Sequence, residues 1–181
     1  MMRFTKNYIM KTIVLCMLTF LSISNFSVLA QEKTKKELKQ ERELQKQKEI
    51  QELVASQNFI FEAQKATPQG GRLIHLDYNT YFLKFNADKT TCDIPFFGRA
   101  YNVPYNGDGG IKFEGKPENV KIENKSKNIN VRATVKGIND SYDLMFRIFY
   151  NGSATLSVNS NSRGPISYDG IISAPKPTEN K

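Results

Sequence analysis

The stretch that decides the fold lies between Asn128 and Ser160 and reads NINVRATVKGINDSYDLMFRIFYNGSATLSVNS. Every second residue is apolar over most of its length, which is the period of a strand with one buried face. Within it, Asn151 and Gly152 predict a tight primed turn, because both residue types tolerate positive φ angles. We therefore expect a lead-in strand followed by a β-hairpin across this turn.

The same two-residue rhythm begins near Phe59 and continues to Ile172. The pattern predicts a first strand that ends before Pro68 and a hairpin turn over residues 86–89, while residues 72–79 are ambiguous. Consecutive strands joined by short loops, with no helical segment between them, pair as antiparallel neighbours, and a sheet of many strands closes or folds onto itself. The sequence therefore predicts a mainly β domain, an antiparallel β-sandwich or flattened barrel of about eight to nine strands.

Residues 31–57 have a different composition, dominated by Glu, Lys, Gln and Leu and without Gly or Pro. This composition favours one charged α-helix in front of the β domain. Its apolar face is thin, so we expect a solvated first half and docking only around Ile50 and Val54, where the helix would cover one end or an edge of the sheet. The alternative is a coiled-coil handle or a spacer from the membrane.

The first 30 residues have the pattern of a secretory signal peptide: a basic start, an apolar run over residues 13–21, and then Val28-Leu29-Ala30. We expect cleavage after Ala30. The apolar run is much shorter than the ~20 residues that cross a bilayer, so we expect no transmembrane span after cleavage. The predicted organisation is a signal peptide (1–30), a charged helix (31–57), a β-rich domain (58–174) and a disordered tail (175–181), in an exported protein of the periplasm or outer cell envelope.

Charge and cysteine content limit the possible partners. The formal charge of +8 falls to +5 when the first 30 residues, which hold three basic and no acidic side chains, are removed. A modest surplus spread along the chain is poor support for nucleic-acid binding, so we expect no nucleic-acid partner. Cleavage also removes Cys16 and leaves Cys92 alone, which excludes an internal disulfide in the mature chain.

Aromatic and polar residues gather in one long loop, residues 97–110, which is neither strand-like nor merely polar. Such side chains stack on rings and hydrogen-bond polar ligands, and loops carry function more often than scaffolds do. The simpler interpretation is that the aromatic side chains plug one end of the sandwich while the arginine pairs with an acid. The candidate ligand-binding residues are Phe97, Arg99, Tyr101, Asn102, Tyr105, Asn106 and Asp108.

The sequence indicates no catalytic residue, no cofactor and no metal site. His75 is the only histidine, and Cys92 alternates with Ile94 and Phe96, which predicts a buried and unreactive thiol. Catalysis by a pair of carboxylates remains an open alternative. Acidic residues are available, but nothing in their spacing places two of them in one cleft. These acids are Asp77, Asp93, Asp108, Glu114, Asp140, Asp143 and Asp169.

A motif in the same region resembles a known family. IPFFGRAY at residues 94–101, followed by GGIKF at residues 109–113, is similar to the hallmark of a domain of unknown function found in small exported bacterial proteins. The resemblance covers roughly residues 31–174. It implies export and a common fold, and it supplies no catalytic residue, cofactor or partner.

Three functional hypotheses follow. The first is a non-enzymatic envelope module that uses the loop at residues 97–110 to bind an unknown small molecule, a glycan or an envelope protein. The second is a periplasmic hydrolase with paired carboxylates, and the third is a helix-tethered structural component of an envelope complex. The sequence favours the first, because it offers a candidate binding loop but no catalytic constellation.

Overall fold

The computed structural model describes residues 35–101, 109–138 and 140–175. Helix α2 (Lys35–Ala55) precedes ten strands. They are β1 (Asn58–Pro68), β2 (Ile74–His75), β3 (Phe82–Asn86), β4 (Thr90–Ile94), β5 (Ile111–Gly115), β6 (Pro117–Asn124), β7 (Asn128–Lys136), β8 (Ser141–Phe149), β9 (Ser153–Ser160) and β10 (Ile166–Ser173). The predicted class, a mainly β domain preceded by one helix, is confirmed. The two-residue strand β2 lies in the segment whose pattern was ambiguous.

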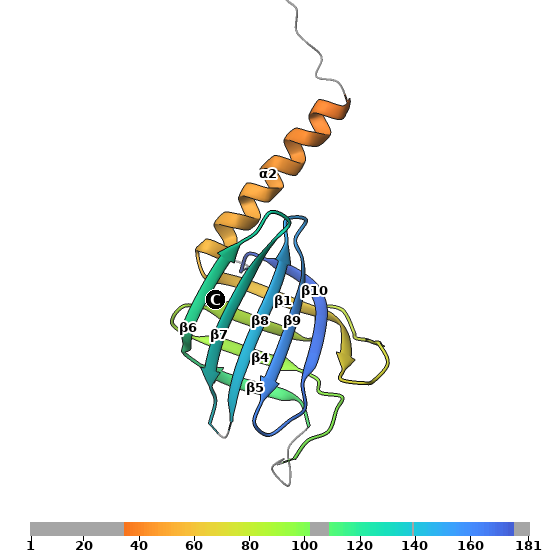
Figure 1. The fold of residues 1–181 in the computed structure, drawn as a ribbon, viewed down its shortest axis with the longest axis vertical. Coiled ribbons are helices and arrows are strands. Elements are labelled where there is room, and N and C mark those ends of the chain that lie inside the picture. Colours follow the sequence, from red (N-terminus) through yellow and green to blue (C-terminus); the bar gives the residue numbers. More distant parts are fainter. Residues whose placement is uncertain (1–34, 102–108, 139, 176–181) are drawn as a thin grey trace, which may run out of the picture. The chain divides into compact units, whose positions relative to one another are not determined.

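All strands belong to one antiparallel sheet with the order β5-β4-β3-β1-β10-β9-β8-β7-β6, and β2 pairs with β1. The two outermost strands, β5 and β6, are consecutive in the chain and are separated only by Lys116. A bend at this residue therefore brings the two edges of the sheet together. In Figure 1, strands β6 to β10 form one layer, and β1, β4 and β5 cross behind it. The result is a nearly closed, flattened barrel.

A glycine allows the close approach at this bend. A Cβ atom added to Gly115 would lie 2.4 Å from the carbonyl oxygen of Lys136, at the end of β7. That separation is far shorter than a non-bonded contact allows, so any side chain at this position would push β5 away from β7. Gly115 thus permits the two ends of the sheet to meet.

Aromatic side chains fill the interior between the layers. The rings of Phe59 and Phe85 stack with their centroids 5.1 Å apart, and Phe146 meets them edge-on at 5.5 and 6.0 Å. Phe61 contacts the same Phe146 ring at 5.9 Å. All four side chains are buried. The centre of the barrel is therefore a packed core, stabilised by apolar burial and by edge-to-face ring contacts.

The turn between β8 and β9 differs from the one predicted. Of its three residues, only Gly152 has a positive φ angle (88°), and its N–H donates to the carbonyl of Phe149 at 2.9 Å. Tyr150 belongs to the turn because β8 ends at Phe149, and its hydroxyl donates to the carbonyl of Lys125 at 2.6 Å in the neighbouring β6–β7 connection. The prediction of two positive φ angles, at Asn151 and Gly152, is wrong, since a three-residue loop needs only one.

The first hairpin turn and the end of β1 were also predicted. The turn over residues 86–89 is confirmed, since β3 ends at Asn86 and the Asn86 side-chain oxygen accepts the N–H of Asp88 at 2.9 Å. The expectation that the first strand ends before Pro68 is wrong by one residue. Pro68 is the last residue of β1, opposite Ile166, where a missing N–H does little harm.

Helix α2 is exposed over its first half and buried near its end. Leu38 and Leu44 are 40% and 60% exposed, whereas Ile50 and Val54 are buried in the same core cluster as the strands. This confirms the predicted docking region. A Cβ atom added to Gly152 would lie 3.7 Å from Ile50 Cδ1, so the helix packs beside the β8–β9 turn. No helix in the described ranges is both long and apolar enough to span a membrane.

Candidate functional site

Three connections meet at the end of the sheet opposite the β8–β9 turn, and we call this region the loop end. They are the β1–β2 connection, the described part of the β4–β5 connection, and the β9–β10 connection. Together they enclose a pocket of about 540 Å³, lined by residues 68–71, 97–99, 101 and 164–165. This volume lies within the range of sites that hold small molecules.

Backbone hydrogen bonds join two of these connections. The Tyr101 N–H donates to the carbonyl of Ser162 at 2.8 Å, and the Gly164 N–H donates to the carbonyl of Arg99 at 2.9 Å. Between them, Ala100 forms an isolated antiparallel bridge with the β9–β10 connection. The two walls of the pocket therefore have a fixed register, although neither is a regular strand.

The third connection is tied to the same framework. The Gln69 N–H donates to the carbonyl of Pro165 at 3.3 Å, and the Gly71 N–H donates to the carbonyl of Pro68 at 3.0 Å. Gly70 between them has a φ angle of 70°, which glycine adopts without steric cost. The tight turn at residues 68–71 thus places backbone directly against the pocket.

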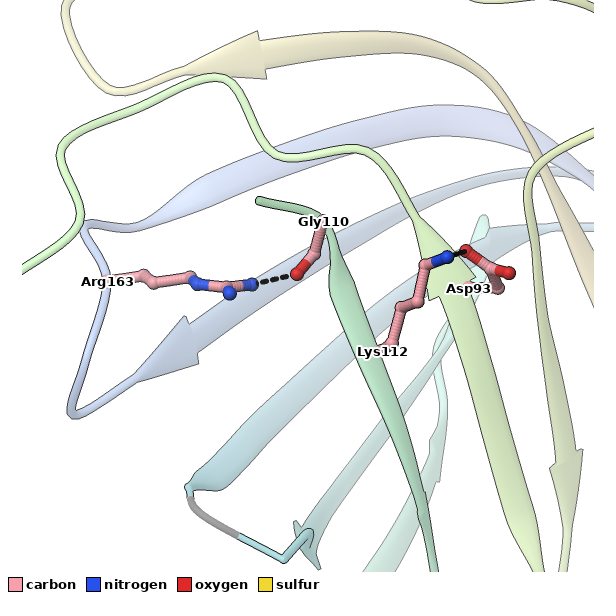
Figure 2. Close-up of polar contacts among 4 residues, drawn as sticks. All are labelled: Asp93, Gly110, Lys112 and Arg163. Atoms are coloured by element: carbon pink, nitrogen blue, oxygen red, sulfur yellow. Dashed lines mark hydrogen bonds and ion pairs between the residues drawn. The ribbon is translucent and has the colours of Figure 1, made fainter. Parts of the chain in front are cut away.

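Arg163 contacts both ends of the β4–β5 connection, and Figure 2 shows its contact with Gly110. Its Nη1 donates to the carbonyl of Gly110, just before β5, and its guanidinium carbon lies 5.4 Å from the ring centroid of Phe96, just after β4. Beside it, the Lys112 ammonium lies 3.4 Å from an Asp93 carboxylate oxygen, which links β5 to β4. Arg163 acts as a positioning residue for the pocket wall, because it fixes where the loop leaves and rejoins the sheet.

A buried tyrosine anchors the start of the same connection. The Tyr168 hydroxyl donates to the carbonyl of Pro95 at 2.7 Å, and the side chain is fully buried. Burial raises the pKa of Tyr168 far above its usual range, so the hydroxyl stays protonated and remains a donor. Cys92 is also buried, and burial, together with the charge of Asp93, raises the pKa of its thiol. The predicted burial of Cys92 is confirmed.

The structure brings three of the predicted site residues together at the pocket. Phe97 is 37% exposed, Tyr101 is 73% exposed, and Arg99 is exposed, so none of these side chains plugs the core. Arg99 was also considered as one half of an ion pair, but within the described ranges no acid pairs with it. The other predicted residues, Asn102, Tyr105, Asn106 and Asp108, lie outside the described residues.

Sequence reasoning missed Arg163 and Tyr168 as parts of this site. Arg163 stands in a Ser-Arg-Gly-Pro run that looks like any surface loop, and Tyr168 alternates with apolar residues as a core side chain does. Both contacts join residues more than 50 positions apart. A single sequence holds no signal for such pairs, because its periodicity shows which face is buried but not which partner lies opposite.

Several of the described candidate acids interact with other residues. Glu114 pairs with Lys89 at 2.6 Å, and the carboxylates of Asp143 and Asp169 accept hydrogen bonds from neighbouring threonine side chains at 2.9 and 2.8 Å. None of the lining residues that the structure describes is an acid. Across residues 35–101, 109–138 and 140–175, no three His, Cys, Asp or Glu side chains gather as a metal site would require.

Together these features define a small mainly β domain with a nearly closed antiparallel sheet, a packed core and a pocket between loops. The model of the family described as "Domain of unknown function (DUF4251)" matches residues 41–172, and the chain belongs to this family. The predicted resemblance to a family of unknown function is thereby confirmed.

The comparison with solved structures agrees with this assignment. The chain is similar to a DUF4251 family protein from Bacteroides eggerthii, known from a crystal structure, with 21% sequence identity and a TM-score of 0.58. The match covers 71% of this chain and 87% of the other. At this identity the similarity shows a shared fold. No curated protein matches the chain.

Proposed function

We propose that the mature protein is an exported, non-enzymatic binding module of the cell envelope, and that the loop-end pocket is its binding site. The observation that carries this proposal is a pocket whose walls come from three separate connections and are tied together by backbone hydrogen bonds. A site that is ordered before its ligand arrives loses less conformational entropy on binding. The arrangement therefore favours recognition.

The side chains around the pocket support binding over catalysis. Phe97 and Tyr101 expose ring surface, and Arg99 exposes a positive charge. Hydrolysis by paired carboxylates would require two acids in one cleft, and among the lining residues that the structure describes there is no acid, histidine or cysteine. Rings and a guanidinium are groups that hold a ligand by packing and by charge.

Export is the second part of the proposal and is supported by the pattern of the first 30 residues. The test is N-terminal sequencing of the protein purified from the envelope fraction of its own cells. We expect the mature chain to begin at Gln31. Recovery of the uncleaved chain from the cytosol would contradict this part of the proposal without affecting the pocket.

The pocket is tested by NMR titration of the mature protein with fractionated small molecules and oligosaccharides from the envelope of the same cells. We expect a fraction that shifts the amide signals of Gly70, Gly98 and Gly164. The double variant Arg99→Gln/Tyr101→Ala should lose these shifts. The matched control Arg147→Gln, on the outer face of β8, should keep them. Shifts that map to the outer face of β8, or that persist in the double variant, would overturn the proposal.

A further inference from the structure

We infer that the ligand of the loop-end pocket is a cyclic carboxylate, a compound whose ring packs on the ring side chains of the pocket and whose carboxylate pairs with Arg99. This inference rests on the proposed function and adds the chemical class of the ligand. It follows from three properties of the described lining: a positive charge outside the described ion pairs, a high content of rings, and backbone N–H groups that the protein itself already uses.

The first property is the charge of Arg99. Arg99 is exposed at the pocket, and none of the described ion pairs involves it. The second guanidinium at the loop end, that of Arg163, is engaged by the carbonyl of Gly110 and the ring of Phe96. Arg99 is therefore the cationic side chain left to receive a ligand, and a guanidinium recognises a carboxylate through two parallel hydrogen bonds.

The second property is the ring content of the lining. Of the ten lining residues that the structure describes, four carry rings: Pro68, Phe97, Tyr101 and Pro165. Phe97 and Tyr101 expose 37% and 73% of their surface, so their faces are open to a ligand. Flat apolar surfaces of this kind pack against the ring of a ligand, and aromatic side chains lose little conformational entropy when they do so.

The third property is that several backbone N–H groups of the lining are already used within the protein. Pro68 and Pro165 have no N–H, and the N–H groups of Gln69, Gly71 and Gly164 donate to carbonyls of the protein. A neutral ligand loses hydrogen bonds to water on entry and gains none from these three groups. A ligand with one strong anionic group and an apolar ring face loses much less, because the ion pair with Arg99 satisfies its most polar group.

The experiment is an NMR titration of the mature protein with two pairs of probes. Sodium glucuronate and sodium benzoate carry a ring and a carboxylate, and glucose and benzyl alcohol are their neutral counterparts. Acetate is the carboxylate without a ring. We expect glucuronate, benzoate or both to shift the amides of Gly70, Gly98 and Gly164, with at least about tenfold higher affinity than the neutral counterpart or acetate.

Two variants separate the charge from the rest of the pocket. Arg99→Gln should remove the preference for the charged probes, so that each binds no more tightly than its neutral counterpart. The control Arg132→Gln, on the outer face of β7, should bind both pairs as the wild type does. Binding of glucuronate but not benzoate would identify an acidic sugar as the source of the carboxylate, and the reverse would identify an aromatic acid.

Other results would overturn the inference. Equal affinity for charged and neutral probes at the pocket would show that the site binds rings without reading charge, in which case the proposed function stands and the ligand class is wrong. A lack of any shift at the three glycines with all five probes would also reject the ligand class. The envelope fractions described above test the binding function separately, since they are not restricted to carboxylates.

Discussion

The two ends of the β body are built in different ways. At the end that carries the β8–β9 turn, which we call the turn end, the connection has three residues and the buried side chains of Ile50 and Val54 pack nearby. At the loop end, the connections are held by backbone hydrogen bonds and by Arg163, while Phe97 and Tyr101 stay exposed. Side-chain burial stabilises the first end, and backbone pairing at the second leaves side chains available for a ligand.

The largest effect should come from the interior that lies between the two ends. Phe146→Ala removes the ring that meets Phe59, Phe61 and Phe85 edge-on, and we expect it to lower the free energy of unfolding by about 3–5 kcal/mol. Equilibrium denaturation with urea measures this value. A loss below ~1 kcal/mol would contradict this expectation. It would mean that the core can collapse around the missing ring and that the ring contacts contribute little to stability.

The turn end should show the next largest effect. Val54→Ala removes two buried methyl groups from a side chain that is 1% exposed, and we expect a loss of about 2 kcal/mol in the free energy of unfolding. Leu44→Ala, in the exposed half of the same helix, is the matched control and should change stability by less than ~0.5 kcal/mol. Equal losses in the two variants would contradict docking through the end of the helix.

Alkaline pH should lower the free energy of unfolding through ionisation of Cys92. Burial raises the pKa of the Cys92 thiol in the folded state, so the folded protein keeps the thiol protonated at a pH where the unfolded chain ionises it. The free energy of unfolding is therefore highest below the unfolded pKa, about 8.5, and falls as the pH rises above that value. Between pH 8.5 and 10 we expect a loss of about 1 kcal/mol per pH unit, measured by denaturation at several pH values. Cys92→Ala should flatten this part of the curve. An identical pH dependence in the variant would assign the effect to other groups.

The smallest effect should come from the loop end. Tyr101→Ala removes a side chain that is 73% exposed, so we expect the free energy of unfolding to change by less than about 0.5 kcal/mol. The same denaturation experiment measures it. A loss comparable to that of Val54→Ala would show that Tyr101 supports the fold, and would weaken its assignment to ligand binding.

Much of the fold could be predicted from the alternation of apolar and polar residues alone. The pattern over residues 128–160 corresponds to β7, β8 and β9, and the composition of residues 31–57 predicted the helix that the structure describes over Lys35–Ala55. Closure of the sheet could not be predicted in the same way. It depends on a bend at Lys116 and on the absence of a side chain at Gly115, and periodicity reports the buried face of a strand but not its neighbour.

The candidate site was predicted only in part. Composition singled out the β4–β5 connection, and Phe97, Arg99 and Tyr101 do line the pocket. The walls from residues 68–71 and 164–165 are Gly- and Pro-rich turns, which carry no sign of function when they are seen separately. They contribute to the pocket because the fold brings them next to residues 97–101, and the local sequence pattern gives no sign of that contact.

The central claim is that the loop end is energetically separate from the scaffold, so that it can serve as a binding surface. Native-state hydrogen exchange of the wild type and Val54→Ala tests it most directly. We predict that protection of the Leu144 amide in β8 falls by the full loss of global stability, about 2 kcal/mol, while the Tyr101 and Gly164 amides change by less than ~0.5 kcal/mol. An equal fall at all three amides would contradict the claim.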